Sequence, residues 1–246
     1  MKFIVWKIYA LYDYFCRYRL ERAVPGILET IKSYQQKTKS TGTKYPTLYQ
    51  AVKTIKELKP KYILESGTGT STIVLAETIL HIQKTNPAYK CHVVSMESLQ
   101  EWHTMATQLL PKKYQGVVDI RLGEREKYEF SIFRGYVHSN IPNKPYDFVF
   151  LDGPSYSDPL GSSTCMDALK IRLESDKQMI SCVVDTRVSS VYMMQKIFGK
   201  AIVKYFPFFR TCSFDMPKLL KNPKLDSSKF KYNCFGKIDI KNSYLN

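Results

Sequence analysis

The sequence predicts an α/β fold in which a mostly parallel sheet carries helices on both faces. Between residues 61 and 207, short apolar runs typical of strands alternate with stretches of helical period. The strand runs hold consecutive apolar residues, which indicates that they are buried on both faces. With 246 residues, 44% of them hydrophobic, the chain can bury a sizeable core as one large domain.

The first half of this pattern begins with an apolar run at residues 62–65, which a glycine-containing loop ends. A helical stretch follows at 72–85, then an apolar strand run at 91–97 and a helical stretch at 99–110. The period therefore changes from strand to helix twice within about fifty residues, as in βαβ units.

The second half repeats the pattern. We expect further strands at residues 117–122, 146–152, 179–185 and 201–206, and further helices at residues 163–174 and 189–198. After a turn marked by Asn222 and Pro223, residues 231–240 are expected to form a last strand that adds antiparallel at or near an edge.

The net charge of +15 is unevenly distributed. Residues 1–62 hold 13 basic and 4 acidic side chains, a net +9, and residues 200–246 hold 10 and 3, a net +7. Residues 63–199 hold 14 and 15, a net −1. A nucleic-acid channel across the central segment therefore has no support from charge, and nucleic acid is the less favoured partner. The basic flanks indicate docking on an anionic membrane or an acidic substrate.

The six cysteines form no CxxC pair and share no metal-ligand spacing with the four histidines, so neither a zinc site nor a disulfide scaffold is expected. Cysteines in apolar runs, such as Cys182, are typical of a reducing compartment, and we expect a cytoplasmic location.

The N-terminal segment is apolar and aromatic, but Lys7, Asp13 and Arg17 interrupt it, so it is not expected to span a bilayer. The pattern favours a helix that packs on the domain or on a second copy, as in a homodimer. The alternative is peripheral contact of residues 1–22 with an anionic membrane, because tyrosines suit the interface and lysines and arginines suit the headgroups.

Carboxylates follow the predicted strands. In a parallel sheet, ligands bind beyond the carboxyl ends of the strands. Those ends carry Glu65, Glu97, Glu124, Asp152 and Asp185. We therefore expect the functional site at this edge.

The loop after the first strand contains Gly67 and Gly69, which permit a tight turn and a close approach to a ligand, while Ser71 or Thr70 would cap the next helix. Neither a GxGxxG nor a GxxxxGK pattern is present. The loop alone is also compatible with a turn that binds nothing. Glu97, about thirty residues on, favours a ligand, because a carboxylate there can accept both ribose hydroxyls. Together these features indicate a nucleoside-containing ligand.

Three stretches resemble motifs of the class I S-adenosylmethionine-dependent methyltransferases: the glycine loop at 63–69, the acid at Glu97, and residues 146–152. The resemblance covers about residues 49–206, and Ser71 replaces the usual third loop glycine. It implies a Rossmann-like fold with a mostly parallel seven-stranded sheet and the cofactor S-adenosyl-L-methionine. We expect residues 1–49 to form an N-terminal helical extension and residues 50–246 the methyltransferase domain.

The resemblance also implies roles for individual residues. Gly67 and Gly69, with Ser71 beside them, would lie against the methionine part of the cofactor, and Glu65 would help to hold its amino group. Glu97 would hold the ribose. Ser98, with Met96, would flank the adenine, and Glu124 resembles the adenine-edge position. Glu124 could equally be a solvated member of the charge run 124–127.

Methyl transfer needs an aligned nucleophile and, for a hydroxyl, a base. Asp152 is the first candidate for the base or for holding the substrate, although it could instead only orient the loop or the cofactor amine. A metal between Asp152 and Asp185, as in similar O-methyltransferases, is not favoured, because Thr186 stands where those relatives carry an amide or acid. His138, in the connection at 135–143, is the second acid/base candidate. Residues 155–163 look like a substrate-side loop.

The prediction is thus methyl transfer from S-adenosyl-L-methionine to a hydroxyl of a small molecule or glycan. Two alternatives stay open: an RNA or protein methyltransferase that docks through the basic flanks, and a non-catalytic membrane-associated relative. The residues after Asp152 depart from the Pro-Pro-aromatic motif of amino-methylating nucleic-acid enzymes, which weakens the RNA alternative.

Overall fold

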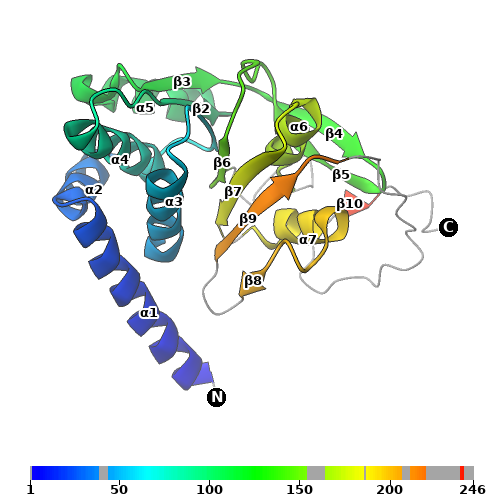
Figure 1. The fold of residues 1–246 in the computed structure, drawn as a ribbon, viewed down its shortest axis with the longest axis horizontal. Helices are drawn as coiled ribbons and strands as arrows, with labels where there is room; N and C mark the ends of the chain where they lie inside the picture. The colour runs from blue at the N-terminus through cyan, green and yellow to red at the C-terminus, as the bar shows by residue number, and fades with distance from the viewer. Residues whose placement is uncertain are drawn as a thin grey trace.

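The structure is a computed structural model that describes residues 2–38, 44–153, 164–185, 187–206, 211–219 and 239–240. Three helices precede the sheet: α1 (Lys2–Ala23), α2 (Ile27–Lys37) and α3 (Tyr45–Leu58). Figure 1 shows α1 reaching away from the rest of the chain, with the N-terminus at its outer end. None of the helices in the described ranges is long and apolar enough to cross a membrane.

The main sheet has the strand order β3-β2-β1-β6-β7-β9-β8. Its strands are β1 (Tyr62–Ser66), β2 (His92–Glu97), β3 (Val118–Leu122), β6 (Phe148–Leu151), β7 (Met179–Asp185), β8 (Tyr205–Phe206) and β9 (Thr211–Pro217). The pairs from β3 to β7 are parallel, and β9 is antiparallel to both of its neighbours. The predicted α/β fold with a mostly parallel sheet is confirmed.

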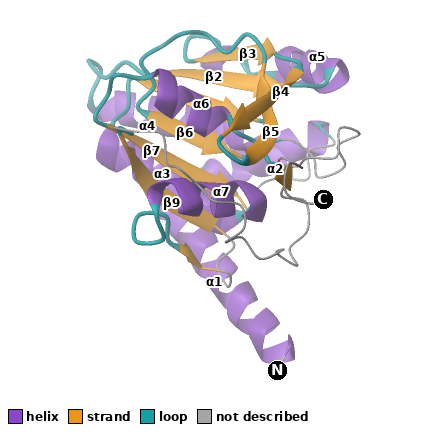
Figure 2. Cartoon of the chain, turned by 90° about the vertical axis from the view of Figure 1, so that its right-hand side faces the viewer, coloured by secondary structure: helices purple, strands orange, loops and turns teal. Residues whose placement is uncertain are grey.

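Helices cover the sheet on both sides (Figures 1 and 2). Besides α3, they are α4 (Thr70–Thr85), α5 (Gln100–Leu109), α6 (Asp167–Glu174) and α7 (Val188–Phe198), with a 3-10 turn, η1, at Lys112–Tyr114. Successive residues of a strand point to opposite faces, and Leu64 accordingly lies in the core under α6 and α7, whereas Ile63 lies in the core under α3 and α4. Consecutive apolar residues of β1 are thus buried in two separate cores, one on each face of the sheet.

A smaller sheet was not predicted. It consists of β4 (Arg125–Phe130), β5 (Phe133–His138) and β10 (Asp239–Ile240), in the order β10-β5-β4. β4 and β5 form an antiparallel hairpin that turns at Ser131, where φ is +55°. The placement of His138 in a connection is therefore wrong, because it ends strand β5, and residues 125–127 belong to β4. Four of the six residues of β4 are charged and only Phe130 is buried, so β4 has no apolar run that would reveal a strand.

The antiparallel strand of the main sheet was placed wrongly. It is β9 at Thr211–Pro217, which pairs with β7, whereas Asp239 and Ile240 pair with β5 in the small sheet. Residues 231–238 lie outside the described residues. The strand expected at 201–206 is limited to β8. The division of the chain at residue 49 stays a prediction.

Candidate functional site

The carboxyl ends of β1 and β6 meet through two glycines. Gly67 has φ +95°, and its N–H donates to the Met96 carbonyl at 2.9 Å. The N–H of Asp152 donates to the Ser66 carbonyl at 3.0 Å. A Cβ atom on Gly67 would lie 2.5 Å from the Cα atom of Gly153, so the loops after the two strands are in backbone contact. Gly67 therefore needs to be glycine both for its conformation and for this contact.

Glu65 lies beneath the glycine turn and is fully buried. Its Oε2 atom accepts hydrogen bonds from Thr72 and Ser95, both at 2.6 Å, while its Oε1 atom has no hydrogen-bond partner in the described chain. Burial raises the pKa of Glu65 to about 7 and outweighs the hydrogen bonds of the Ser71, Ser95 and Thr72 hydroxyls, which lower it; the charge of Asp152 adds a smaller increase.

The helix after the turn starts without the predicted cap. The backbone N–H of Gly69 donates to the Thr72 hydroxyl at 3.0 Å, so Thr72 rather than Ser71 satisfies the turn. The Ser71 hydroxyl is buried close to the Glu65 carboxylate, whose pKa it lowers, but the geometry falls short of a full hydrogen bond to any described residue. Ser71 Oγ and Glu65 Oε1 are thus two neighbouring buried polar atoms whose hydrogen bonding is incomplete within the described chain.

Glu97 ends β2 beside this turn. Its Oε1 atom accepts the backbone N–H groups of Ser98 at 2.7 Å and Leu99 at 2.9 Å. These bonds orient the half-buried carboxylate, and no hydrogen bond to Oε2 is found among the described residues. Glu97 is therefore held by its own loop with one oxygen available to a ligand.

The loop after β3 lies next in the sheet. The N–H of Gly123 donates to the Glu97 carbonyl at 2.8 Å, and a Cβ on Gly123 would lie 2.6 Å from the methyl group of Met96. Met96 is buried and belongs to the core under α6 and α7. The side chain of Glu124 is exposed, and its carbonyl accepts the N–H of Ser139 at 2.7 Å.

Asp152 and Asp185 follow neighbouring strands, as predicted. Arg187, which is buried, donates from Nη2 to the Asp152 carbonyl at 2.6 Å, and the Thr47 hydroxyl donates to Asp185 Oδ1 at 2.9 Å. Arg187 thus ties together the loops after β6 and β7, which spacing in the sequence did not reveal. In the ranges that the structure describes, no group of three His, Cys, Asp or Glu side chains is close enough to hold a metal ion.

His138 belongs to a buried polar cluster. Its backbone N–H donates to Asp167 Oδ1 at 2.8 Å, its ring Nδ1 lies 2.6 Å from Asp167 Oδ2, and the Ser66 hydroxyl donates to the same Oδ2 at 2.6 Å. His138 and Asp167 have only 1% and 0% of their side chains exposed. His138 Nε2 is buried and has no hydrogen-bond partner in the described chain.

Charge pairing decides the protonation of this cluster. Burial lowers the pKa of His138, but the charge of Asp167 and its hydrogen bond outweigh burial and raise the pKa above its usual range. Burial raises the pKa of Asp167, but His138 and the donated hydrogen bonds outweigh it and lower that pKa. Both shifts favour the charged pair, in which the ring Nδ1–H donates to Asp167 Oδ2.

Most of the predicted site residues lie together at this edge. Glu65, Gly67, Gly69, Ser71, Glu97, Ser98, Glu124 and Asp152 lie at or beyond the carboxyl ends of adjacent strands β3, β2, β1 and β6. His138 approaches the same edge from the small sheet, with Ser66 and Asp167. Residues 155–163 and Thr186 lie outside the described residues. The edge offers oriented carboxylates, a glycine turn and buried polar atoms whose hydrogen bonding is incomplete, a set that fits an amine- and ribose-containing ligand.

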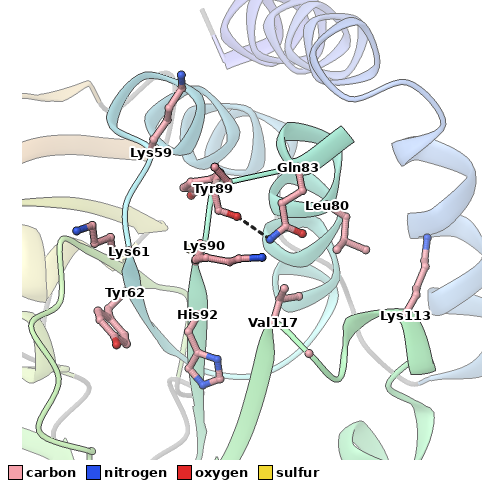
Figure 3. Close-up of a pocket in the computed structure, with 13 residues that line it drawn as sticks. Lys59, Lys61, Tyr62, Leu80, Gln83, Tyr89, Lys90, His92, Lys113 and Val117 are labelled. Atoms are coloured by element: carbon pink, nitrogen blue, oxygen red, sulfur yellow. Dashed lines mark hydrogen bonds between the residues drawn. The ribbon is translucent and has the colours of Figure 1, made fainter. Parts of the chain in front are cut away.

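A separate cavity of about 850 Å³ opens at the opposite edge, beside the amino ends of β1 and β2 (Figure 3). Lys59, Lys61, Lys90 and Lys113 are among the residues that line it, together with His92. It contains none of the predicted site residues, so it is not the site that the sequence indicates.

No family model matches this chain, and no curated protein matches it by sequence. Among solved structures it is similar to the S-adenosylhomocysteine-bound methyltransferase PaMTH1 of Podospora anserina, at 14% identity and a TM-score of 0.47, over 82% of this chain and 80% of that chain. It is also similar to an S-adenosylmethionine-dependent methyltransferase of Aquifex aeolicus, at 15% identity and a TM-score of 0.39, over 70% of this chain and 92% of that one. Neither likeness carries an activity or a residue's role to this chain.

Proposed function

We propose that this chain is an S-adenosylmethionine-dependent methyltransferase. The observation that carries the proposal is the juxtaposition of the Gly67 turn with the oriented carboxylate of Glu97 at the carboxyl edge of the sheet. A tight turn beside an acid at the end of the next strand is the arrangement that nucleoside cofactors use in parallel α/β sheets. The resemblance of residues 63–69 and 146–152 to methyltransferase motifs supports S-adenosylmethionine as the cofactor.

In this proposal, different residues at the carboxyl edge of the sheet bind different parts of the cofactor. Gly67, Gly69 and Ser71 border the methionine part, and Glu65 Oε1 accepts from the amino group, which its missing partner supports. Glu97 Oε2 accepts from the ribose, with Ser98 and Glu124 near the adenine. When bound, the cofactor supplies an electrophilic methyl group on a sulfonium.

The acceptor that we propose is a hydroxyl of a small molecule or glycan, with Asp152 as the base that takes its proton. The near-neutral charge of residues 63–199 supports an uncharged acceptor over nucleic acid. His138 is the second candidate for acid/base work, and its pairing with Asp167 favours a donor role for Nε2.

Titration calorimetry with S-adenosylhomocysteine tests the proposal. The wild-type chain should bind, and Glu97→Ala should weaken binding at least about tenfold, because a charged hydrogen bond to the ligand is lost. Glu57→Ala, which removes an exposed carboxylate from α3, is the matched control and should bind as the wild type does. The proposal fails if the wild-type chain shows no binding, or if Glu97→Ala and Glu57→Ala bind equally well.

A further inference from the structure

The helix α1 has two apolar faces, and only one of them packs on the protein. Cys16 and Leu20 are buried against the neighbouring helices α2 and α3. The other side exposes five large side chains to between 49% and 71%: Ile8, Leu11, Tyr14, Phe15 and Tyr18. Their spacing of three and four residues places them on one side of the helix.

This clustering is not the ordinary scatter of apolar residues over a surface. Nine large apolar side chains are exposed in the described chain, and α1, with these five, is the only described helix that carries more than one of them. Together with Tyr12 they form a continuous apolar surface that belongs to α1 alone. Figures 1 and 2 show α1 extending away from the sheet. A contiguous apolar stripe on a projecting helix indicates a surface that binds something.

The charged side chains of α1 indicate which kind of partner the apolar stripe would bind. Of the charged side chains described on this helix, those that are exposed are all cationic: Lys7, Arg17, Arg19 and Arg22. The acids face inward, since Asp13 is half-buried and the Glu21 carboxylate accepts the N–H groups of Gly26 and Leu28. A second copy of α1 would bring like charges together. A surface of anionic headgroups complements them.

Two of the arginines border the stripe, although Arg19 also donates to the Tyr49 hydroxyl of α3 at 3.2 Å and Arg17 lies over the ring of Tyr45. The Arg22 guanidinium lies 5.8 Å from the centre of the Tyr18 ring, and Arg19 lies 5.7 Å from that of Phe15. Aromatic rings with cations at their edges are suited to the boundary between acyl chains and headgroups, where the ring meets the apolar layer and the cation meets phosphate.

We propose that α1 is an interfacial anchor that lies along a bilayer of anionic phospholipids. The stripe from Ile8 to Tyr18 enters the boundary between headgroups and acyl chains, and the arginines contact lipid phosphates. The proposal is independent of the transferase reaction, because it involves no residue of the candidate site.

Vesicle flotation of the full chain tests this proposal. We expect binding to vesicles of phosphatidylcholine mixed with phosphatidylglycerol, and much weaker binding to pure phosphatidylcholine or at high salt. The double variant Leu11→Glu and Phe15→Glu should lower the partition coefficient at least about tenfold, because two apolar side chains leave the interface. Leu58→Glu, at an exposed apolar position on α3, is the matched control and should bind normally.

A charge-only pair tests the proposal without introducing acids into the stripe. Arg17→Gln with Arg22→Gln should weaken binding to the anionic vesicles several-fold, while Lys144→Gln with Lys200→Gln, the same change of charge away from α1, should not. Equal losses from both pairs would overturn the proposal. The absence of binding to anionic vesicles would also overturn it, and a dimer in sedimentation that Leu11→Glu dissociates would then assign the stripe to a second copy.

Discussion

Replacing Gly67 with alanine separates the two demands that the structure makes on this residue. Its φ of +95° is unfavourable for a residue with a Cβ, at about 1–2 kcal/mol. Its Cβ would also lie 2.5 Å from the Cα of Gly153, and such an overlap costs about 1–3 kcal/mol because backbone cannot rotate away. Alanine recovers about 0.4–1 kcal/mol from the unfolded chain. The expected net loss is about 2–4 kcal/mol.

Two other glycines isolate the contributions. Gly199 has a similar φ of +91° with nothing within 4 Å of an added Cβ, so Gly199→Ala carries only the conformational cost, about 0.5–1 kcal/mol net. Gly153 makes the same close contact from the other side without a positive φ, so Gly153→Ala carries only the overlap.

The assay is urea denaturation of the three variants, followed by calorimetry with S-adenosylhomocysteine. We expect Gly67→Ala to be the least stable, and both Gly67→Ala and Gly153→Ala to lose ligand affinity, since each forces apart the loops after β1 and β6. Gly199→Ala should bind normally. If Gly67→Ala destabilises no more than Gly199→Ala, the backbone contact is not a constraint and the reasoning is refuted.

Three further predictions concern carboxylates. Asp152→Asn should keep its affinity for S-adenosylhomocysteine and lose about a hundredfold or more in turnover, measured as cofactor consumption with an accepted hydroxyl substrate; unchanged turnover would remove Asp152 from the role of base. Because the folded-state pKa of Glu65 is raised to about 7, the folded chain holds a proton that the unfolded chain releases, and stability should fall between about pH 4.5 and 7. Glu65→Gln should reduce that fall, on the order of 3 kcal/mol, in urea titrations at pH 5 and 8; an identical pH dependence in both chains would contradict the buried acid. Asp167→Asn should cost roughly 3 kcal/mol in the same denaturation assay because it leaves a buried histidine without its charged partner, whereas Asp176→Asn, which removes an exposed carboxylate paired with Lys218, should change nothing measurable.

The strands that the sequence predicts correctly are those with consecutive apolar residues. β1, β2, β6 and β7 carry consecutive buried residues, and each begins and ends within about two residues of its predicted range. Strand β9 was not predicted, because only alternate residues of it are buried: Cys212, Phe214 and Met216. An alternating pattern is typical of a strand with one exposed face, so a test for a period of two would have found it.

The candidate site likewise contains residues that the sequence predicts and residues that it does not. Glu97 and Asp152 follow apolar strands, so their common edge follows from the parallel sheet alone. The role of Asp167 could not be predicted in this way, because Asp167 is 101 residues from Ser66 in the chain and contacts it only through tertiary packing. An acid at the start of a helix can be an exposed cap or, like Asp167, the acceptor at the centre of a buried cluster, and the sequence spacing is the same in both cases.

That unpredicted cluster gives the hairpin of β4 and β5 a role at the candidate site. Asp167 receives hydrogen bonds from Ser66, in β1, and from His138, at the end of β5, so one buried carboxylate joins the two sheets. The next residue, Ser139, donates its N–H to the Glu124 carbonyl in the loop after β3. The small sheet is thereby fixed both to the strand that precedes the glycine turn and to the loop expected to border the adenine. Loss of the Asp167 carboxylate should therefore disturb both ends of the cofactor site, although Asp167 itself lies in neither.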